Sequence, residues 1–367
     1  MAANSNTTVP TNGASVWFAA KTELKAAQAE LADAPVGIAR QPAFDRFLQA
    51  QRRCTDLIHR WLAESMELDY ATHPSMVLSL DVDGVLESEE EFSSTTLLGA
   101  SALRLLQLGG VSALLNTARS LVEVRERADQ LRLPGGIAEM GAVTWDGTQQ
   151  REHSLLNERA SAALTRLRSV LRGDSSVVVD SRRTQSVRAS RIVDGRPVSI
   201  LGRDARQLLD ENRLTDLTFW VAPTHTDFVA RSVDKGSGFI QLQRELGLTS
   251  LPIAAMGDAM CDLPILRTAK SAFLPAATLP SYVAGRHQRL ARSRFIGDRA
   301  LWDAACRLVP VPSLQRLVIE QAGALRFPEW VPVASRRPPI PSTSLLPRFA
   351  AAFASARLQT TIRHEEV

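Results

Sequence analysis

The chain is poor in cysteine and in aromatic residues. Only 3 of its 367 residues are cysteine, and 5% are aromatic. Cys54, Cys261 and Cys306 lie far apart, with no CxxC pair and no cysteine–histidine cluster at the spacing of zinc ligands. This pattern does not indicate a zinc site, and it suits a reducing compartment.

Three further absences narrow the range of partners. No window approaches the roughly 18 consecutive apolar residues that a membrane helix needs. The polar start of the chain lacks the basic-then-apolar order of a secretory signal. The net charge is +4, and lysine and arginine form no block interleaved with aromatic residues. We therefore expect a cytoplasmic protein that binds neither a membrane nor nucleic acid.

The most informative stretch that is present is MVLSLDVDGVLE, at residues 76–87. An apolar run leads to Asp81 and Asp83 and then to Gly84, which allows the backbone to turn. Runs of this length that end at a glycine predict a buried strand of a parallel sheet. Ligands of such sheets bind at the carboxyl ends of the strands, so both aspartates are candidate functional residues.

Strand and helix patterns alternate on both sides of this stretch, with short connections between them. That alternation predicts right-handed crossover units in a doubly wound, Rossmann-like parallel sheet, which places the chain in the α/β class. The core helices are predicted at 96–108 and 236–246, with one more that ends at about residue 131 and one that begins at residue 263. The core strands are predicted at 76–80, 111–115, 136–139, 142–145, 253–256 and 271–274, and the strand at 271–274 is expected to be the last strand of the core.

Residues 150–232 break this rhythm, because their predicted strands follow one another across short turns. We interpret them as an inserted α+β cap that covers the mouth of the site. Arg188 and Arg191 on a cap strand are equally compatible with an anionic substrate and with water. The domain prediction is a helical N-terminal extension with a disordered start (1–74), the core (75–149 and 233–308), the cap (150–232) and a basic, helical and Pro-rich C-terminal extension (309–367).

Polar residues of complementary type follow other predicted strands or precede helices. Thr117 follows the second core strand, where its hydroxyl and nearby backbone N–H groups could hold phosphate oxygens. Lys235 precedes a helix and supplies a compact cation. Asp258 and Asp262 add carboxylate oxygens, and an oxygen-rich set of this kind favours Mg²⁺. Together with a carboxylate nucleophile, these residues fit phosphoryl transfer through an aspartyl-phosphate.

The same residues resemble, in order, the four motifs of the haloacid dehalogenase superfamily. The motifs are DVDGV at 81–85, the strand-end Thr117, the Lys235-Gly236 pair and GDAMCD at 257–262. The cap between the second and third motifs resembles that of the branch with Cof-type and sucrose-phosphate phosphatases. The resemblance covers about residues 75–277. It implies a haloacid dehalogenase-like phosphatase that hydrolyses a small phosphorylated metabolite, with a sugar phosphate favoured, using Mg²⁺.

Carried over residue by residue, the resemblance implies that Asp81 is the nucleophile and Asp83 the general acid/base. Thr117 would bind the phosphoryl group and Lys235 would balance its charge. Asp258 would ligate Mg²⁺, and Asp262 would do so directly or through water. The expected substrate-binding residues are Thr117, Ala118, Arg119 and Lys235, and the expected metal ligands are Asp81, Asp83 through its backbone carbonyl, Asp258 and Asp262.

Four positions depart from the pattern of the resembled branch. Val85 replaces a common Thr, Ala118 a Gly, and Met140 and Cys261 each an Asn. None of these changes removes an essential charge. Two alternatives to a hydrolase stay open, namely a phosphomutase and a catalytically silent protein that binds a phosphometabolite or acts as a scaffold. A protein partner for the terminal extensions also stays open.

Overall fold

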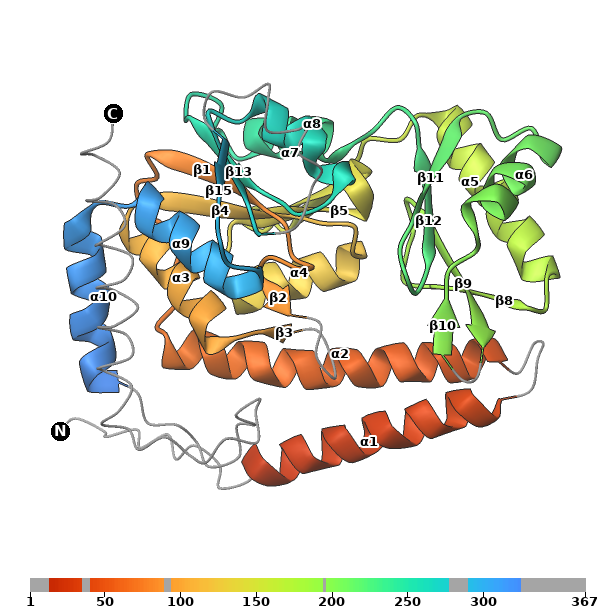
Figure 1. Cartoon of the computed structure of the whole chain (residues 1–367), viewed down its shortest axis with the longest axis horizontal. Helices are drawn as coiled ribbons and strands as arrows, with labels where there is room; N and C mark the ends of the chain where they lie inside the picture. Colours follow the sequence, from red (N-terminus) through yellow and green to blue (C-terminus); the bar gives the residue numbers. More distant parts are fainter. Residues whose placement is uncertain (1–12, 35–39, 89–93, 194–195, 277–289, 325–367) are drawn as a thin grey trace.

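The computed structural model describes residues 13–34, 40–88, 94–193, 196–276 and 290–324. Figure 1 shows three parts: a core built on a large sheet, a smaller cap at one side, and a pair of N-terminal helices that runs beneath both. Within these ranges, no helix combines the length and the apolar character that crossing a membrane requires.

The core is one eight-stranded sheet in the order β15-β14-β13-β1-β4-β5-β6-β7. Its central strand is the predicted β1, which pairs in parallel with β13 on one side and with β4 on the other. The predicted doubly wound α/β fold is confirmed. The parallel strands are β1 (Met76–Leu80), β4 (Val111–Asn116), β5 (Gly135–Ala138), β13 (Ile253–Met256), β14 (Ser271–Leu274) and β15 (Leu290–Arg292).

Helices cover both faces of this sheet. One face is packed by α3 (Leu97–Leu108), α4 (Leu121–Gln130), α9 (Gly297–Leu308) and α10 (Val311–Ala324), and the other by α7 (Lys235–Glu245) and α8 (Leu263–Thr268). Capping residues in the sequence determine where two of these helices begin. The Thr96 hydroxyl accepts a hydrogen bond from the Gly99 N–H at the start of α3, and Ser120 forms a capping box at the start of α4. A small hairpin of β2 (Glu87–Ser88) and β3 (Ser94–Thr95) precedes α3.

Three predictions about the core sheet are wrong. Strands β6 (Val143–Asp146) and β7 (Arg151–Ser154) are antiparallel, and β7 belongs to the core although it lies within the predicted cap range of 150–232. All four residues of β7 are exposed at the sheet edge, so it lacks the apolar pattern of a buried strand. The strand at 271–274 is also not the last of the core, because β15 pairs beyond it.

The cap is a five-stranded sheet with helices α5 and α6 on the side that faces away from the core (Figure 1). These helices and the sheet enclose a separate apolar cluster that includes Leu164, Leu209 and Phe228. The elements of the cap are α5 (Glu158–Gly173), β8 (Val177–Val179), β9 (Val187–Val193), β10 (Arg196–Val198), α6 (Gly202–Glu211), β11 (Leu217–Val221) and β12 (Thr226–Ala230).

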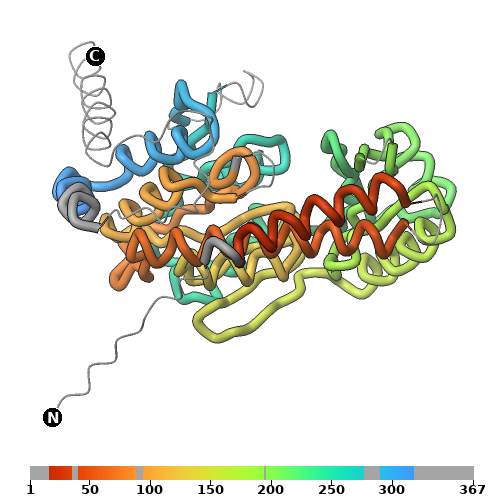
Figure 2. The backbone as a smooth tube through the Cα atoms, turned by 90° about the horizontal axis from the view of Figure 1, so that it is seen from below, coloured from red at the N-terminus to blue at the C-terminus, as the bar shows by residue number. Residues whose placement is uncertain are grey.

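The N-terminal extension is a helical hairpin of α1 (Gly13–Asp33) and α2 (Arg40–Ser65). Figures 1 and 2 show both helices running side by side along the core and onto the cap. The α1 stripe that includes Trp17 and Leu24 packs on α2, around Ala50 and Cys54. The predicted disordered start lies outside the described residues apart from residues 13 and 14, which begin α1, and the predicted Pro-rich segment near 336–347 also lies outside them.

Candidate active site

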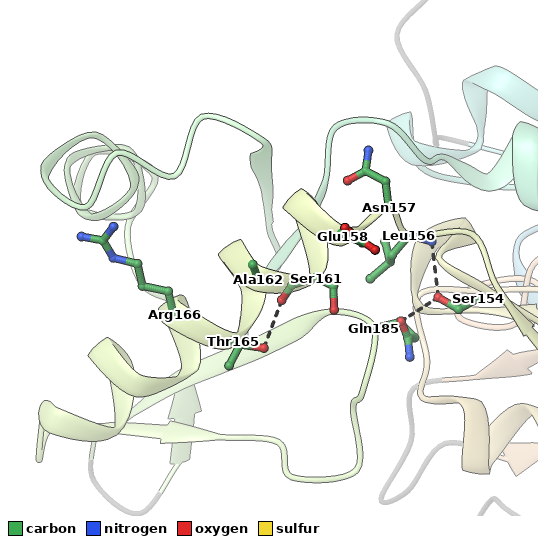
Figure 3. A pocket seen from close by; sticks show the side chains of 9 residues that line it. All are labelled: Ser154, Leu156, Asn157, Glu158, Ser161, Ala162, Thr165, Arg166 and Gln185. Atoms are coloured by element: carbon green, nitrogen blue, oxygen red, sulfur yellow. Dashed lines mark hydrogen bonds between the residues drawn. The ribbon is translucent and has the colours of Figure 1, made fainter.

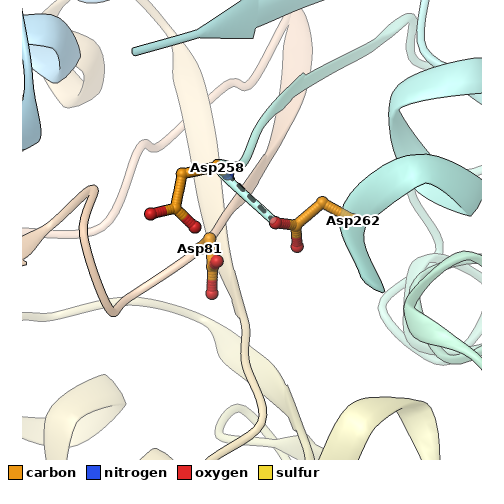
Figure 4. Close-up of side chains that lie close together, drawn as sticks. All are labelled: Asp81, Asp258 and Asp262. Carbon is orange, nitrogen blue, oxygen red and sulfur yellow. Dashed lines mark hydrogen bonds between the residues drawn. The ribbon is translucent and has the colours of Figure 1, made fainter. Parts of the chain in front are cut away.

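Three carboxyl groups from two neighbouring strands converge at one edge of the core sheet. Asp81 directly follows β1, whereas Asp258 and Asp262 follow β13, whose Met256 pairs with Leu80. Each aspartate offers an oxygen that lies within 4.8 Å of the oxygens of the other two. Figure 4 shows the three side chains turned toward one another. The convergence of these acidic residues, predicted from the sequence, is therefore present.

Lys235 brings one positive charge into this acidic group. Its side chain is 2% exposed, and its Nζ atom lies 2.9 Å from Asp81 Oδ1 and 2.5 Å from Asp262 Oδ1. Burial alone would lower the pKa of this ammonium group, but Asp262 and Asp81 raise it well above its ordinary value. Lys235 is therefore a permanently charged bridge between the first and fourth motifs.

The position of Lys235 is fixed by residues that the sequence analysis did not identify. The Asn116 carboxamide donates hydrogen bonds to the Lys235 carbonyl oxygen (2.9 Å) and to Ser79 Oγ (3.0 Å). Asp234 caps the helix that begins with Lys235, since its carboxylate accepts the Ser237 N–H at 2.7 Å. Asn116 stands directly before Thr117, and that place at the end of a buried strand is the one sequence signal that could have identified it.

Asp262 has a different role from Asp258 in this arrangement. Its Oδ1 contacts Lys235, while its Oδ2 accepts the backbone N–H groups of Asp258 (3.0 Å) and Ala259 (2.9 Å). Both oxygens thus already hold the loop and the ammonium in place. This geometry favours Asp81 and Asp258 as the direct ligands of a cation, with Asp262 as the residue that orients them.

The electrostatics of the cluster fit a divalent cation. Burial and the Asp262 carboxylate raise the pKa of Asp258 to about 6, and the same two causes raise the pKa of Asp81 well above its ordinary value despite Lys235. Both shifts result from burial together with repulsion between carboxylates, which one ammonium does not balance. Closely spaced carboxylate oxygens of this kind match the ligand preference of Mg²⁺.

Asp83 lies apart from this cluster and pairs with Arg119. The Arg119 Nε donates to both Asp83 oxygens at 3.1 Å, and Nη2 contacts Asp83 as well. Burial would raise the pKa of Asp83, but the guanidinium lowers it to about 2. The Asp83 side chain is nevertheless 44% exposed to solvent.

Arg119 is itself held by a buried ionic network behind Asp83 that the sequence did not indicate. Glu87 is fully buried and lies 2.8 Å from Arg119 Nη1 and 2.6 Å from Arg127 Nε. His59 of α2 is 3.4 Å from the same carboxylate, and its Nε2 accepts the Thr95 N–H at 3.0 Å. Burial lowers the pKa of His59 to about 4, so the ring is neutral at pH 7.

Thr117 directly follows β4 at the same sheet edge as Asp81, and its buried hydroxyl accepts the Arg119 N–H at 3.2 Å. The Ala118 carbonyl oxygen accepts a hydrogen bond from Arg183 of the cap. Two departures from the resembled pattern also lie near the site. Met140 is buried, lies two residues after β5 and has a positive φ of 61°. Burial raises the pKa of Cys261 to about 12, so this residue is a thiol.

The cap rests directly on these motifs. The Glu139 carboxylate accepts the N–H groups of Thr184 (3.1 Å) and Gln185 (2.8 Å) and the Ser186 hydroxyl (2.8 Å). The fully buried Arg183 reaches the backbone of the second motif. These core–cap contacts were not predicted, because the cap residues that form them belong to no recognisable motif.

A hollow of about 680 Å³ lies where α5 begins, beside the link from the core to the cap (Figure 3). It does not include the carboxylate cluster. Most of the residues that line it are of polar type: Ser154, Leu156, Asn157, Glu158, Ser161, Ala162, Thr165, Arg166 and Gln185.

The comparisons with known proteins bear on the fold. No protein-family model and no curated protein matches the sequence. Among solved structures, a protein of Thermoplasma acidophilum has a TM-score of 0.51 at 15% identity, covering 64% of this chain and 99% of its own. A haloacid dehalogenase-like hydrolase from Bacteroides thetaiotaomicron has a TM-score of 0.50 at 13% identity, with the same coverage of 64% and 99%. The chain therefore has the fold of the haloacid dehalogenase-like hydrolases, as the order of its motifs predicts.

Proposed function

We propose that this chain is a Mg²⁺-dependent phosphomonoester hydrolase that acts through an aspartyl-phosphate on a small phosphorylated metabolite. The observation that carries the proposal is the placement of Lys235 between Asp81 and Asp262, with Asp258 beside them. A carboxylate nucleophile needs positive charge close by to approach a dianionic phosphoryl group. A binding site for a neutral ligand would gain nothing from this buried charge arrangement.

In the first step, an Asp81 carboxylate oxygen attacks phosphorus while the bond from phosphorus to the ester oxygen breaks. Asp83, protonated once its pair with Arg119 has opened, gives that proton to the leaving alkoxide; while the pair is closed, Asp83 is ionised. In the second step, a water attacks the aspartyl-phosphate, Asp83 takes the water proton, and inorganic phosphate leaves as the Asp81 carboxylate is restored. Lys235 stays charged throughout and offsets the charge on the phosphoryl oxygens.

Asp81 and Asp258 would hold the metal ion, with the Asp83 carbonyl and Asp262 as the further ligands that the resemblance implies. A bound Mg²⁺ supplies additional charge neutralisation for the phosphoryl group. Thr117, with the backbone of Ala118 and Arg119, would bind the phosphoryl oxygens at the end of β4. Arg119 holds Asp83 at the mouth of the site, where a leaving alcohol would emerge.

The proposed substrate class is a sugar phosphate or a similar small phosphoester. This part of the proposal is supported by the place of the cap, which lies between the second and third motifs as in the sugar phosphatases that the sequence resembles. The cap also brings polar side chains toward the core, since Arg188 lowers the pKa of Asp83 together with Arg119. Polar side chains close to Asp83 suit a hydroxyl-rich leaving group.

The test is release of inorganic phosphate from p-nitrophenyl phosphate and from a panel of phosphorylated sugars. We expect activity with Mg²⁺, none after treatment with EDTA, and recovery when Mg²⁺ is added back. Asp81→Asn should be inactive and folded, and a fully active Asp81→Asn variant would refute the assignment. Phosphate that is passed between sugar hydroxyls without release would favour a mutase. Metal binding without any turnover would favour the silent phosphometabolite-binding protein.

A further inference from the structure

The helix α2 is long enough to contact the core and the cap at the same time. Its 26 residues extend over about 39 Å at the α-helical rise. Figure 2 shows α1 and α2 crossing from the core to the cap as an antiparallel pair. The core and cap are also joined by the two chain segments that enter and leave the cap and by the contacts of Arg183 and Glu139, and α2 adds a further connection at a distance from these.

The first two turns of α2 bind the cap through its β8 strand. The Gln41 carboxamide donates to the Val179 carbonyl oxygen (2.7 Å) and accepts the Val179 N–H (2.9 Å), which completes the pairing of that strand residue. The Asp45 carboxylate accepts the Ser181 hydroxyl at 3.0 Å. Phe44 is 6% exposed and packs in one apolar cluster with Val178 and Ile192 of the cap, where Ala43 and Leu31 also lie.

The other end of α2 is anchored in the core. Arg52 pairs with Glu126 of α4, and Leu62 and Met66 belong to the main apolar cluster of the core. His59 reaches the Glu87 carboxylate and the Thr95 backbone behind the catalytic edge. The core end is therefore fixed by buried contacts, and its position is coupled to the network that holds Arg119.

The outer helix α1 stiffens this connection. It buries Trp17, Leu24 and Leu31 against α2 along most of its length. Two exposed ion pairs, Arg46–Glu30 and Arg53–Glu23, also join the two helices. A helical pair that is packed along its length bends less easily than a single helix, so a displacement at one end is resisted at the other.

We propose that α2 is a brace that fixes the angle of the cap over the active site, with Gln41, Phe44 and Asp45 as positioning residues. The cap loop that follows β8 carries Arg183, which contacts the Ala118 carbonyl oxygen, and Arg182, which lies 3.8 Å from Glu123 of α4. By holding Val179 and Ser181 at the start of this loop, the brace sets where those arginines meet the second motif. The proposal deepens the proposed hydrolase function and rests on it for its kinetic consequence.

The first test measures amide hydrogen exchange in the substrate-free protein and compares the native chain with a Gln41→Ala, Asp45→Ala double variant. The probes are the Leu155 N–H, which donates to the Ala142 carbonyl oxygen at the link to the cap, and the Gln185 N–H, which donates to Glu139. Releasing the brace should make exchange at both sites at least about fivefold faster, because the cap opens more often. The amides of β1 should not change, which shows that the core stays folded.

Arg46→Ala is the matched control. Arg46 lies one residue after Asp45 and does not contact the cap. Its replacement removes one exposed ion pair with α1, which contributes little beside the buried apolar contacts between the two helices. We expect native exchange at Leu155 and Gln185 in this variant. Phe44→Ala, a second release variant, should repeat the effect of the double variant through the loss of apolar contact. Faster exchange confined to residues near Val179, with Leu155 and Gln185 unchanged in both release variants, would overturn the proposal.

The second test is kinetic and uses p-nitrophenyl phosphate with Mg²⁺. Because a looser cap weakens binding of the leaving group while Asp81 and Lys235 stay in place, we expect KM to rise about three- to tenfold and kcat to change less. A general loss of folded protein would lower kcat alone. The exchange experiment needs no substrate, so failure of the brace and failure of the hydrolase proposal give different results.

Discussion

Gly84 lies so close to Asp258 that a Cβ atom at Gly84 would stand 2.1 Å from Asp258 Oδ2. The glycine also has a φ of +74°, a conformation that disfavours side chains. The turn after Asp83 and the loop after β13 thus meet without space between them. This close approach explains why position 84, in the turn that follows β1, needs a glycine.

Replacing Gly84 by Ala should displace the Asp258 carboxylate as well as strain the turn. We expect kcat to fall at least about tenfold and the free energy of unfolding to fall by about 1–3 kcal/mol. Gly247→Ala is the control, because Gly247 has a φ of +68° with no atom within 4 Å of the added Cβ. It should lose stability through strain while activity stays native. Equal losses of activity in the two variants would show that the contact with Asp258 is unimportant.

The two aspartates of the first motif should differ in their effect on stability. Burial and neighbouring carboxylates raise the pKa of Asp81, so its negative charge destabilises the metal-free fold at pH 7, whereas Arg119 lowers the pKa of Asp83 and its charge stabilises the fold. In urea unfolding with EDTA, Asp81→Asn should be at least as stable as the native chain and Asp83→Asn less stable. Both variants should be inactive. A large loss of stability in Asp81→Asn would contradict this picture.

Much of the core and of its carboxylate cluster could be predicted because each signal is local. Strand β1 is mostly apolar, Asp81 directly follows it and Asp258 lies two residues after β13, so the parallel sheet itself brings the two aspartates together. The pairing of Lys235 with both Asp81 and Asp262 follows from the same rule, since α7 begins at that edge. The periodicity of the sequence is sufficient to predict which residues meet wherever the fold alone places them side by side.

The remaining features depend on contacts between distant residues. Gln41 and Val179 are 138 residues apart, and nothing in either local sequence indicates that they meet. The edge strand β7 is exposed throughout, so its charged residues resemble a loop. From the sequence, Glu87 and Arg127 would be expected on the surface because they are charged, yet they are buried as an ion pair. Such pairs become visible only once the chain has folded, which is why the extension had no predicted role.

Arg119 should be more sensitive than Arg127 to replacement by lysine, although both contact Glu87. Lysine cannot reproduce the planar fork that holds both Asp83 oxygens. We therefore expect Arg119→Lys to lower kcat at least about tenfold, and Arg127→Lys to lower it much less. Each should cost about 1–3 kcal/mol of stability through the buried Glu87. Steady-state kinetics with denaturant unfolding would measure both effects, and equal kinetic losses would refute a special role for the Asp83 contact.

His59 should make the fold sensitive to mild acid. Burial lowers its pKa from 6.5 to about 4, so the unfolded chain takes up a proton first as the pH falls below 6.5. Stability that is fully present above pH 6.5 should therefore be lost between pH 6.5 and 4, by up to about 3 kcal/mol from this residue. The His59→Gln variant keeps an acceptor for the Thr95 N–H but does not titrate. The difference in unfolding free energy between this variant and the native chain should move in favour of the variant as the pH is lowered from 7 to 4.5. A difference that stays constant across this range would show that His59 is protonated equally in the folded and unfolded states.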